Sequence, residues 1–131
     1  MRFLIIEDQA DVSRLVTALL KPYGDCVVAE DGRSGLDAVI GALDSGASFD
    51  ALFLDIMMPN MNGHETLDAI RKLEEARKIY PPEAIKIIMT TALADRENVM
   101  TAFRNQADAY LVKPILQKSL LEAMTKAGLE V

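Results

Sequence analysis

The sequence has 131 residues, a length that fits one domain. Its formal net charge of −6 disfavours binding to nucleic acid, because phosphate backbones are also negative. The first apolar run, Phe3 to Ile6, is too short for a signal peptide or a membrane span, so a cytoplasmic protein is expected. The single cysteine, Cys26, lies in an apolar run and is expected to be a small buried residue in a reducing compartment.

Short β-rich runs alternate with longer stretches of helical periodicity. The expected strands are residues 3–6, 26–29, 51–54, 85–90 and 109–112. Apolar residues recur every three or four positions after each of them, which predicts helices over residues 11–21, 33–43, 64–78, 97–103 and 116–127. Several strands are nearly all apolar, as expected when helices cover both faces of a sheet. Five successive strand–helix units predict an α/β fold with a doubly wound parallel sheet.

Chemically complementary residues follow four of the expected strands. They are three acids, a hydroxyl and an ammonium group: Glu7, Asp8, Asp55, Thr91 and Lys113. A single charged residue after a strand is unremarkable, but the carboxyl ends of parallel strands meet at one edge of the sheet. Ligands of open α/β sheets bind at that edge, so these side chains predict a functional site there.

Their chemistry favours phosphoryl transfer. Two carboxylates about 4 Å apart repel by roughly 4 kcal/mol at an effective dielectric near 20, so a cluster of three calls for a cation. Oxygen ligands with room for water suit Mg²⁺. Asp55 is the candidate nucleophile, because carboxylates can accept phosphoryl groups. Lys113 would neutralise charge on the transferring group, and the Thr91 hydroxyl would hydrogen-bond its oxygens.

The sequence resembles the receiver domain of two-component response regulators, and the single-domain chemotaxis type in particular. The resemblance covers nearly the whole chain. It rests on four motifs in the family's order: Glu7-Asp8 after FLII, LDIMMPNMNG (54–63), Thr91-Ala92 and YLVKP (110–114). It implies one receiver domain over residues 1–131 without an effector domain. The implied fold is flavodoxin-like, with five parallel strands in the order 2-1-3-4-5 and helices on both faces.

The resemblance also implies a role for each matched residue. Asp55 is the phosphoacceptor and takes its phosphoryl group from a sensor histidine kinase or a histidine phosphotransfer protein. The implied protein is a signalling phosphoacceptor, which catalyses only its own phosphorylation and dephosphorylation. Mg²⁺, which Mn²⁺ can replace, is held by Asp8, Asp55 and the backbone carbonyl of Met57, with Glu7 acting through water. The implied switch residues are Thr91, Ala92, Tyr110 and Lys113, and the residues that shape the loops are Pro59, Gly63 and Pro114, with a cis bond before Pro114.

The implied output surface consists of the fourth helix, the fifth strand and the fifth helix, which bind a downstream protein. The sequence departs from the family in three places. The segment 74–85 is longer than usual, and a glycine common in relatives is replaced by Gln106, so Asn105 is expected to cap the fourth helix. Met57 and Leu93 are apolar where fast-hydrolysing relatives have polar side chains, which predicts a long-lived aspartyl phosphate.

Three other functions fit parts of the pattern. A flavodoxin-like electron carrier would need a phosphate-binding loop after the first strand, where this chain has the acidic EDQA. A phosphatase of the haloacid dehalogenase kind would carry its nucleophile after the first strand, whereas Asp55 follows the third. A degenerate receiver that binds partners without phosphorylation stays open, although all of the chemical positions are filled.

Overall fold

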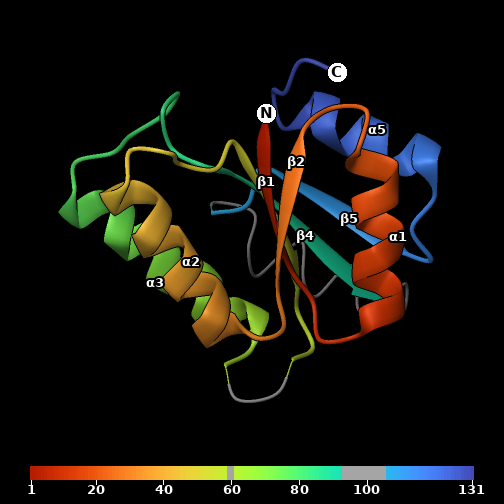
Figure 1. The fold of residues 1–131 in the computed structure, drawn as a ribbon, viewed down its shortest axis with the longest axis horizontal. Coiled ribbons are helices and arrows are strands. Elements are labelled where there is room, and N and C mark those ends of the chain that lie inside the picture. Colours follow the sequence, from red (N-terminus) through yellow and green to blue (C-terminus); the bar gives the residue numbers. More distant parts are fainter. Residues whose placement is uncertain (59–60, 93–105) are drawn as a thin grey trace.

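A parallel sheet forms the centre of the structure, and helices pack on both of its faces (Figure 1). The computed structural model describes residues 1–58, 61–92 and 106–131. The strands are β1 (Arg2–Ile6), β2 (Asp25–Ala29), β3 (Ala51–Asp55), β4 (Lys86–Ala92) and β5 (Ala109–Lys113). Their order in the sheet is β2-β1-β3-β4-β5, and all neighbouring pairs are parallel. The predicted fold class and strand order are therefore confirmed.

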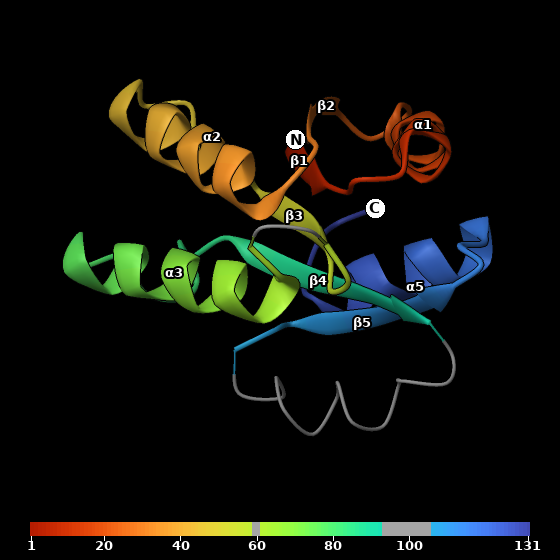
Figure 2. The same ribbon diagram turned by 90° about the horizontal axis from the view of Figure 1, so that it is seen from below.

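The described helices divide between the two faces of the sheet. They are α1 (Ala10–Leu20), α2 (Gly32–Asp44), α3 (Gly63–Ala76) and α5 (Gln117–Lys126). Figure 2 shows α2 and α3 on one side of the sheet and α1 and α5 on the other. The helix expected over residues 97–103 and its expected cap at Asn105 lie outside the described residues.

Two apolar clusters, one on each face, make up the core. Side chains alternate along a strand, so Leu4 and Ile6 pack toward α2 and α3 while Phe3 and Ile5 pack toward α1 and α5. All four are at most 2 % exposed. Burial on both faces explains why the strands are apolar throughout instead of alternating with polar residues.

The edge strand β2 is the most exposed strand of the sheet. Val27 and Val28 are 40 % and 45 % exposed, and Cys26 is half-buried instead of fully buried as expected. The reason is that β2 has a neighbouring strand, β1, on one side only. Burial, together with the charge of Asp25, raises the pKa of the Cys26 thiol.

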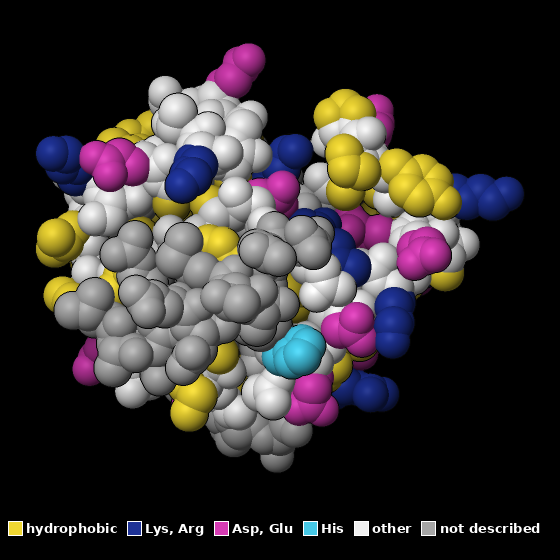
Figure 3. Space-filling model, turned by 180° about the vertical axis from the view of Figure 1, so that it is seen from behind, with side chains coloured by type: hydrophobic (Ala, Val, Ile, Leu, Met, Phe, Trp, Pro, Cys, Tyr) yellow, Lys and Arg dark blue, Asp and Glu magenta, His cyan; other side chains and the backbone are white. Residues whose placement is uncertain are grey.

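A polar cluster lies where β4 and β5 begin, at the amino edge of the sheet. Arg71 of α3 donates to Glu74 (2.7 Å), to Asp108 (3.0 Å) and to the backbone oxygens of Ile85 and Gln106 (both 2.9 Å). Glu74 in turn accepts the amide of Ile85 at 2.7 Å. The cluster borders a hollow of about 350 Å³. Figure 3 shows that acidic and basic side chains lie side by side on one face of the molecule. It ties α3 to the starts of two strands.

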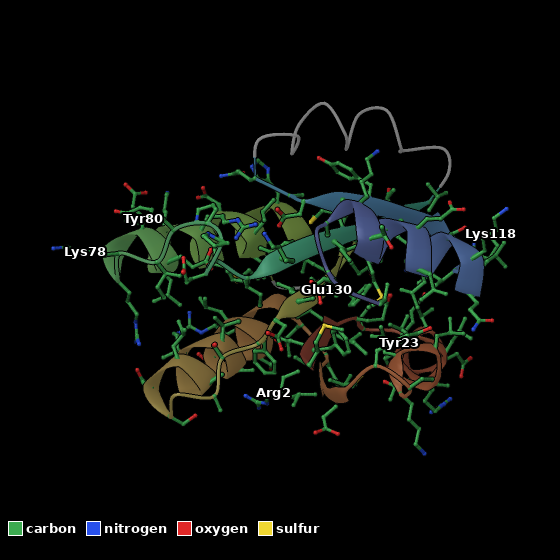
Figure 4. The ribbon with its side chains drawn as sticks, turned by 90° about the horizontal axis from the view of Figure 1, so that it is seen from above. Arg2, Tyr23, Lys78, Tyr80, Lys118 and Glu130 are labelled. Carbon is green, nitrogen blue, oxygen red and sulfur yellow. The ribbon has the colours of Figure 1, made fainter. Side chains whose placement is uncertain are left out.

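The long segment after α3 also lies at the amino edge. The helix ends at Ala76, Lys78 has a positive φ of 58°, and the Pro81–Pro82 peptide bond is cis. Figure 4 shows Lys78 and the exposed Tyr80 together at one end of the molecule. The segment therefore lies at the edge of the sheet opposite Asp55, which ends β3.

Candidate functional site

Three carboxylates meet at the carboxyl edge of the sheet, which is the lower end in Figure 1. Glu7 follows β1 and Asp55 ends the neighbouring strand β3, so the two side chains lie next to each other. Both are 4 % exposed, whereas Asp8 is exposed. Oxygen atoms of all three residues lie within 4.8 Å of one another. Two buried carboxylates need a compensating charge, because their desolvation is costly.

Lys113 supplies that charge from the end of β5. Its Nζ donates to Glu7 Oε1 at 3.0 Å and to Asp55 Oδ1 at 3.4 Å. The ammonium thus bridges two strands that are not its neighbours in the sheet. The sequence prediction that these charged groups gather at one edge is confirmed for these four residues.

The electrostatics of the cluster reflect its burial. Burial raises the pKa of Glu7 to about 7; the hydrogen bond from Lys113 lowers it, and the charge of Asp55 raises it again. Burial alone would lower the pKa of Lys113, but its hydrogen bond to Glu7 and the charges of both acids outweigh burial and raise it. Lys113 therefore stays charged, while Glu7 exchanges its proton near neutral pH.

The backbone around these residues holds them in place. The amide of Glu7 donates to the oxygen of Ala29 at 3.0 Å, and the amide of Gln9 donates to Glu7 Oε2 at 3.2 Å. The Lys113–Pro114 bond is cis, as the resemblance implies.

The start of α3 is packed closely against the end of β3. The amide of Gly63 donates to the oxygen of Ile56 at 3.0 Å, and a Cβ at position 63 would lie 2.6 Å from Ile56 Cα and 2.7 Å from the Asp55 oxygen. Asn62 and Glu65 form a capping box at this helix start, which the sequence analysis missed although the spacing N-x-x-E indicates one. Pro59, expected to shape the same loop, lies outside the described residues.

The expected switch residues lie on the two strands beyond Asp55. Asp55 is in register with Thr90 of β4, so Thr91 is one residue further along. Thr91 is buried, and its hydroxyl donates to the oxygen of Ala92 at 3.3 Å. Tyr110 of β5 is half-buried, which raises the pKa of its hydroxyl.

Of the two residues expected to control hydrolysis, only Met57 is among the described residues. The side chain of Met57 is 75 % exposed, so it does not shield Asp55 in this state. Leu93 lies outside the described residues.

The donor chemistry of the cluster fits a divalent cation. Three carboxylates offer only hard oxygen atoms, and the exposed Asp8 leaves room for water, which Mg²⁺ and Mn²⁺ retain when they bind. Met57, whose carbonyl is the other expected ligand, follows Asp55 by two residues.

Residues 3–125 match the family described as response regulator receiver domain. The chain belongs to the response regulator receiver family. It is 32 % identical over 127 residues to the regulatory protein VanRB of Enterococcus faecalis, covering 93 % of this chain and 50 % of that protein. It is also 32 % identical over 128 residues to the hybrid signal transduction histidine kinase L of Dictyostelium discoideum, covering 97 % of this chain and 7 % of the kinase.

This receiver also resembles solved structures along most of its length. The chemotaxis protein CheY4 of Vibrio cholerae superimposes with a TM-score of 0.74 at 27 % identity, covering 96 % of this chain and 97 % of that one. By contrast, the receiver spans half the length of VanRB and far less of the hybrid kinase. Among the described residues, no helix is both long and apolar enough to cross a membrane. The family assignment carries with it phosphoryl acceptance on an aspartate, in signalling with histidine kinases.

Proposed function

We propose that Asp55 is the phosphoacceptor of this receiver and that its donor is the phosphohistidine of a sensor kinase or a phosphotransfer protein. One observation carries the proposal. Asp55 is a buried carboxylate that meets Lys113 and two further carboxylates at the carboxyl edge of a receiver sheet. In the transfer, a carboxylate oxygen of Asp55 forms a bond to phosphorus as the bond from phosphorus to the histidine nitrogen breaks, and the imidazole takes up a proton.

The acidic cluster holds Mg²⁺ in this proposal. Asp8, Asp55 and the carbonyl of Met57 would hold the ion, and Glu7 would act through water. When bound, the ion neutralises negative charge on the phosphoryl oxygens. Lys113, already 3.4 Å from Asp55 Oδ1, is placed to contact the same oxygens after transfer.

The switch works through hydroxyl and aromatic side chains beyond the site. Phosphorylation adds roughly one to two negative charges at Asp55. The Thr91 hydroxyl, which now donates to the Ala92 oxygen, turns toward the phosphoryl group, and Tyr110 follows it inward. This is a shift between two states that differ by a few kcal/mol. It changes the surface that β5 and α5 offer to a downstream protein. The helix expected over residues 97–103, which would complete this surface, lies outside the described residues.

Intact mass measurement tests the proposal directly. The wild type and Asp55→Asn are incubated with phosphoramidate, with Mg²⁺ or with EDTA. We expect one phosphoryl adduct in the wild type, only with Mg²⁺, and none in the variant. An adduct that persists in Asp55→Asn would move the acceptor to another residue. An unmodified wild type that still binds Mg²⁺ would instead favour a module that works without phosphorylation.

The apolar side chain of Met57, two residues after Asp55, leads to a separate proposal on phosphate lifetime. An apolar side chain cannot orient an attacking water by hydrogen bonding, so the aspartyl phosphate is long-lived. Met57→Asn is expected to shorten the half-life severalfold, measured by following the loss of the phosphorylated band on a phosphate-affinity gel. Met57→Leu is the matched control and should leave the half-life unchanged. Equal half-lives for Met57→Asn and the wild type would contradict this role.

A further inference from the structure

The outer edge of β2 carries backbone groups that point away from the sheet. The amide of Asp25 donates to the oxygen of Met1, and the oxygen of Ala29 accepts from the amide of Glu7. Backbone direction alternates along a strand, so residues 25, 27 and 29 bond to β1. The amides and carbonyls of Cys26 and Val28 therefore face outward, and within the part of the chain that the structure describes no hydrogen bond reaches them.

This edge is open and apolar. Figures 1 and 2 both show β2 at the margin of the sheet between α1 and α2, with no described element beyond it. Val27, on the α2 side of the sheet, and Val28, on the α1 side, are among the exposed large hydrophobic residues. Leu15 is exposed as well, and its helix α1 contacts β2. Natural edge strands are usually protected by a lysine, a proline or a bulge, and β2 has none of these.

The charged residues of β2 and of the turn that follows it are all acidic. Asp25, Glu30 and Asp31 are the only charged residues between Gly24 and Gly32. Asp25 and Glu30 are exposed, and neither forms an ion pair with any residue that the structure describes. A second copy pairing antiparallel through β2 would bring the Asp25 end of one strand against the Glu30 end of the other. Repulsion between these acids disfavours a second copy, so charge complementarity favours a partner with basic residues.

We infer that β2 is a docking edge for an extended, basic-flanked segment of a partner protein, which adds a strand to the sheet. An extended backbone can replace water as the hydrogen-bond partner of the outward groups of Cys26 and Val28. The exposed valines supply apolar contact on either face of the added strand, and lysine or arginine residues at its ends meet Asp25 and Glu30. Asp55 is not part of this edge, so docking does not require it, although the carboxyl end of β2 adjoins the site where the oxygen of Ala29 accepts the amide of Glu7.

The probe is the peptide acetyl-Lys-Lys-Val-Thr-Val-Thr-Lys-Lys-amide, titrated to millimolar concentration into the ¹⁵N-labelled protein. We expect the largest amide shifts at Cys26 and Val28, and slower hydrogen exchange of both amides. A peptide with proline in place of the first threonine, which lacks one backbone donor, should bind more weakly. A peptide with glutamate in place of every lysine should not bind at all.

Two variants separate the backbone contribution from the charge contribution. Val28→Pro removes an outward amide while leaving the hydrogen bonds between β1 and β2 in place, because the Val28 amide faces away from β1. It should abolish the shifts, and unchanged β1 amide signals would show that the sheet is intact. The double variant Asp25→Asn/Glu30→Gln keeps every backbone group, and we expect about three- to tenfold weaker binding, the scale of two exposed ion pairs.

Three results would overturn the inference. The first is the absence of shifts at Cys26 and Val28 at millimolar basic peptide. The second is equal binding of the glutamate peptide, since charge would then play no part. The third is self-association of the wild type, measured by sedimentation, that the Asp25→Asn/Glu30→Gln variant retains and Val28→Pro loses, because the occupant would then be a second copy.

Discussion

Glu7 and Asp55 show how two acids of one site differ through their contacts. Both are buried and both touch Lys113, but the contact of Glu7 is the shorter one, at 3.0 Å against 3.4 Å. Burial leaves Glu7 with a pKa of about 7, so near neutral pH it exists in both forms. Lys113 cannot fully balance two neighbouring carboxylates, which is why a cation is expected at this site.

Folding stability should report this protonation of Glu7. In EDTA, the unfolded chain loses the Glu7 proton near pH 4.5, while the folded protein keeps it until about pH 7. The folded state thus binds more protons in that window, so its stability falls as the pH rises. Relative to Glu7→Gln, the wild type should lose about 2 to 3 kcal/mol between pH 5 and pH 8. Urea denaturation of both proteins at several pH values measures this difference, and parallel stability profiles would contradict it.

The site was predictable from the sequence because strand ends are easy to locate. Apolar runs that stop at Glu7, Asp55 and Lys113 mark the positions where parallel strands finish, and topology then places their side chains together. The elevated pKa of Glu7 was not predictable, because it depends on how completely neighbouring groups exclude water. Sequence patterns give the neighbours of a residue in the chain, and exposure depends on its neighbours in space.

At the scale of elements, the start of α3 is held to the phosphoacceptor strand by a contact that only glycine allows. A Cβ at Gly63 would collide with the backbone of Ile56 and Asp55. Gly63→Ala should therefore push the helix start away, costing about 1 to 3 kcal/mol in unfolding free energy. Because Asp55 would be displaced, its phosphorylation by phosphoramidate should be at least about tenfold slower.

Gly41 offers a matched control for this change. It lies in α2, and a Cβ there would have no neighbour within 4 Å. Gly41→Ala should stabilise the protein by about 0.5 to 1 kcal/mol through helix propensity, and leave the phosphorylation rate unchanged. Calorimetry and intact mass time courses of both variants give the two readouts. A Gly63→Ala protein with wild-type kinetics would show that the contact does not position Asp55.

Arg71 makes the corresponding contact at the other end of α3. Its guanidinium balances Glu74, which is 5 % exposed, and holds the backbone before β4 and β5. Arg71→Met should cost about 2 to 4 kcal/mol, because it leaves a buried carboxylate without its partner. Lys72→Met is the control on the same helix: its ion pair with Asp68 is exposed, so the expected loss is under about 1 kcal/mol. Similar losses in urea denaturation would argue against a buried ion pair at Arg71.

The ion pair between Arg71 and Glu74 was not predicted, although the sequence indicates that Glu74 is buried. Glu74 lies four residues after Ile70 and seven after Leu67, on the buried stripe of the helix. A charged residue on such a stripe indicates a buried partner, but the partner could not be named, since Asp108 and Ile85 come close only through the sheet. Helix periodicity thus predicts burial better than it predicts pairing.

For the whole molecule, the carboxyl ends and the amino ends of the strands differ in their effect on stability. The carboxyl edge buries carboxylates at a cost to folding, chiefly through desolvation and to a lesser degree through the charge of Asp55, which together raise the pKa of Glu7. The amino edge carries the balanced cluster of Arg71, Glu74 and Asp108. Favourable contacts at the amino edge and in the apolar core offset the electrostatic cost of the site, so the receiver still folds. A ligand that relieves this repulsion must stabilise the entire domain, because small domains unfold in one cooperative step.

Mg²⁺ is therefore expected to raise the unfolding free energy by binding only the folded state. At a free concentration about one hundred times its dissociation constant, the gain should be about 2.7 kcal/mol. Asp8→Asn removes the exposed carboxylate of the cluster and should abolish most of this gain. Asp11→Asn, an exposed acid of α1 outside the cluster, should retain it. Urea denaturation midpoints of both variants, measured at several Mg²⁺ concentrations, test this expectation. An equal increase in the two variants would mean that the ion stabilises the protein by general screening and not by binding at the cluster.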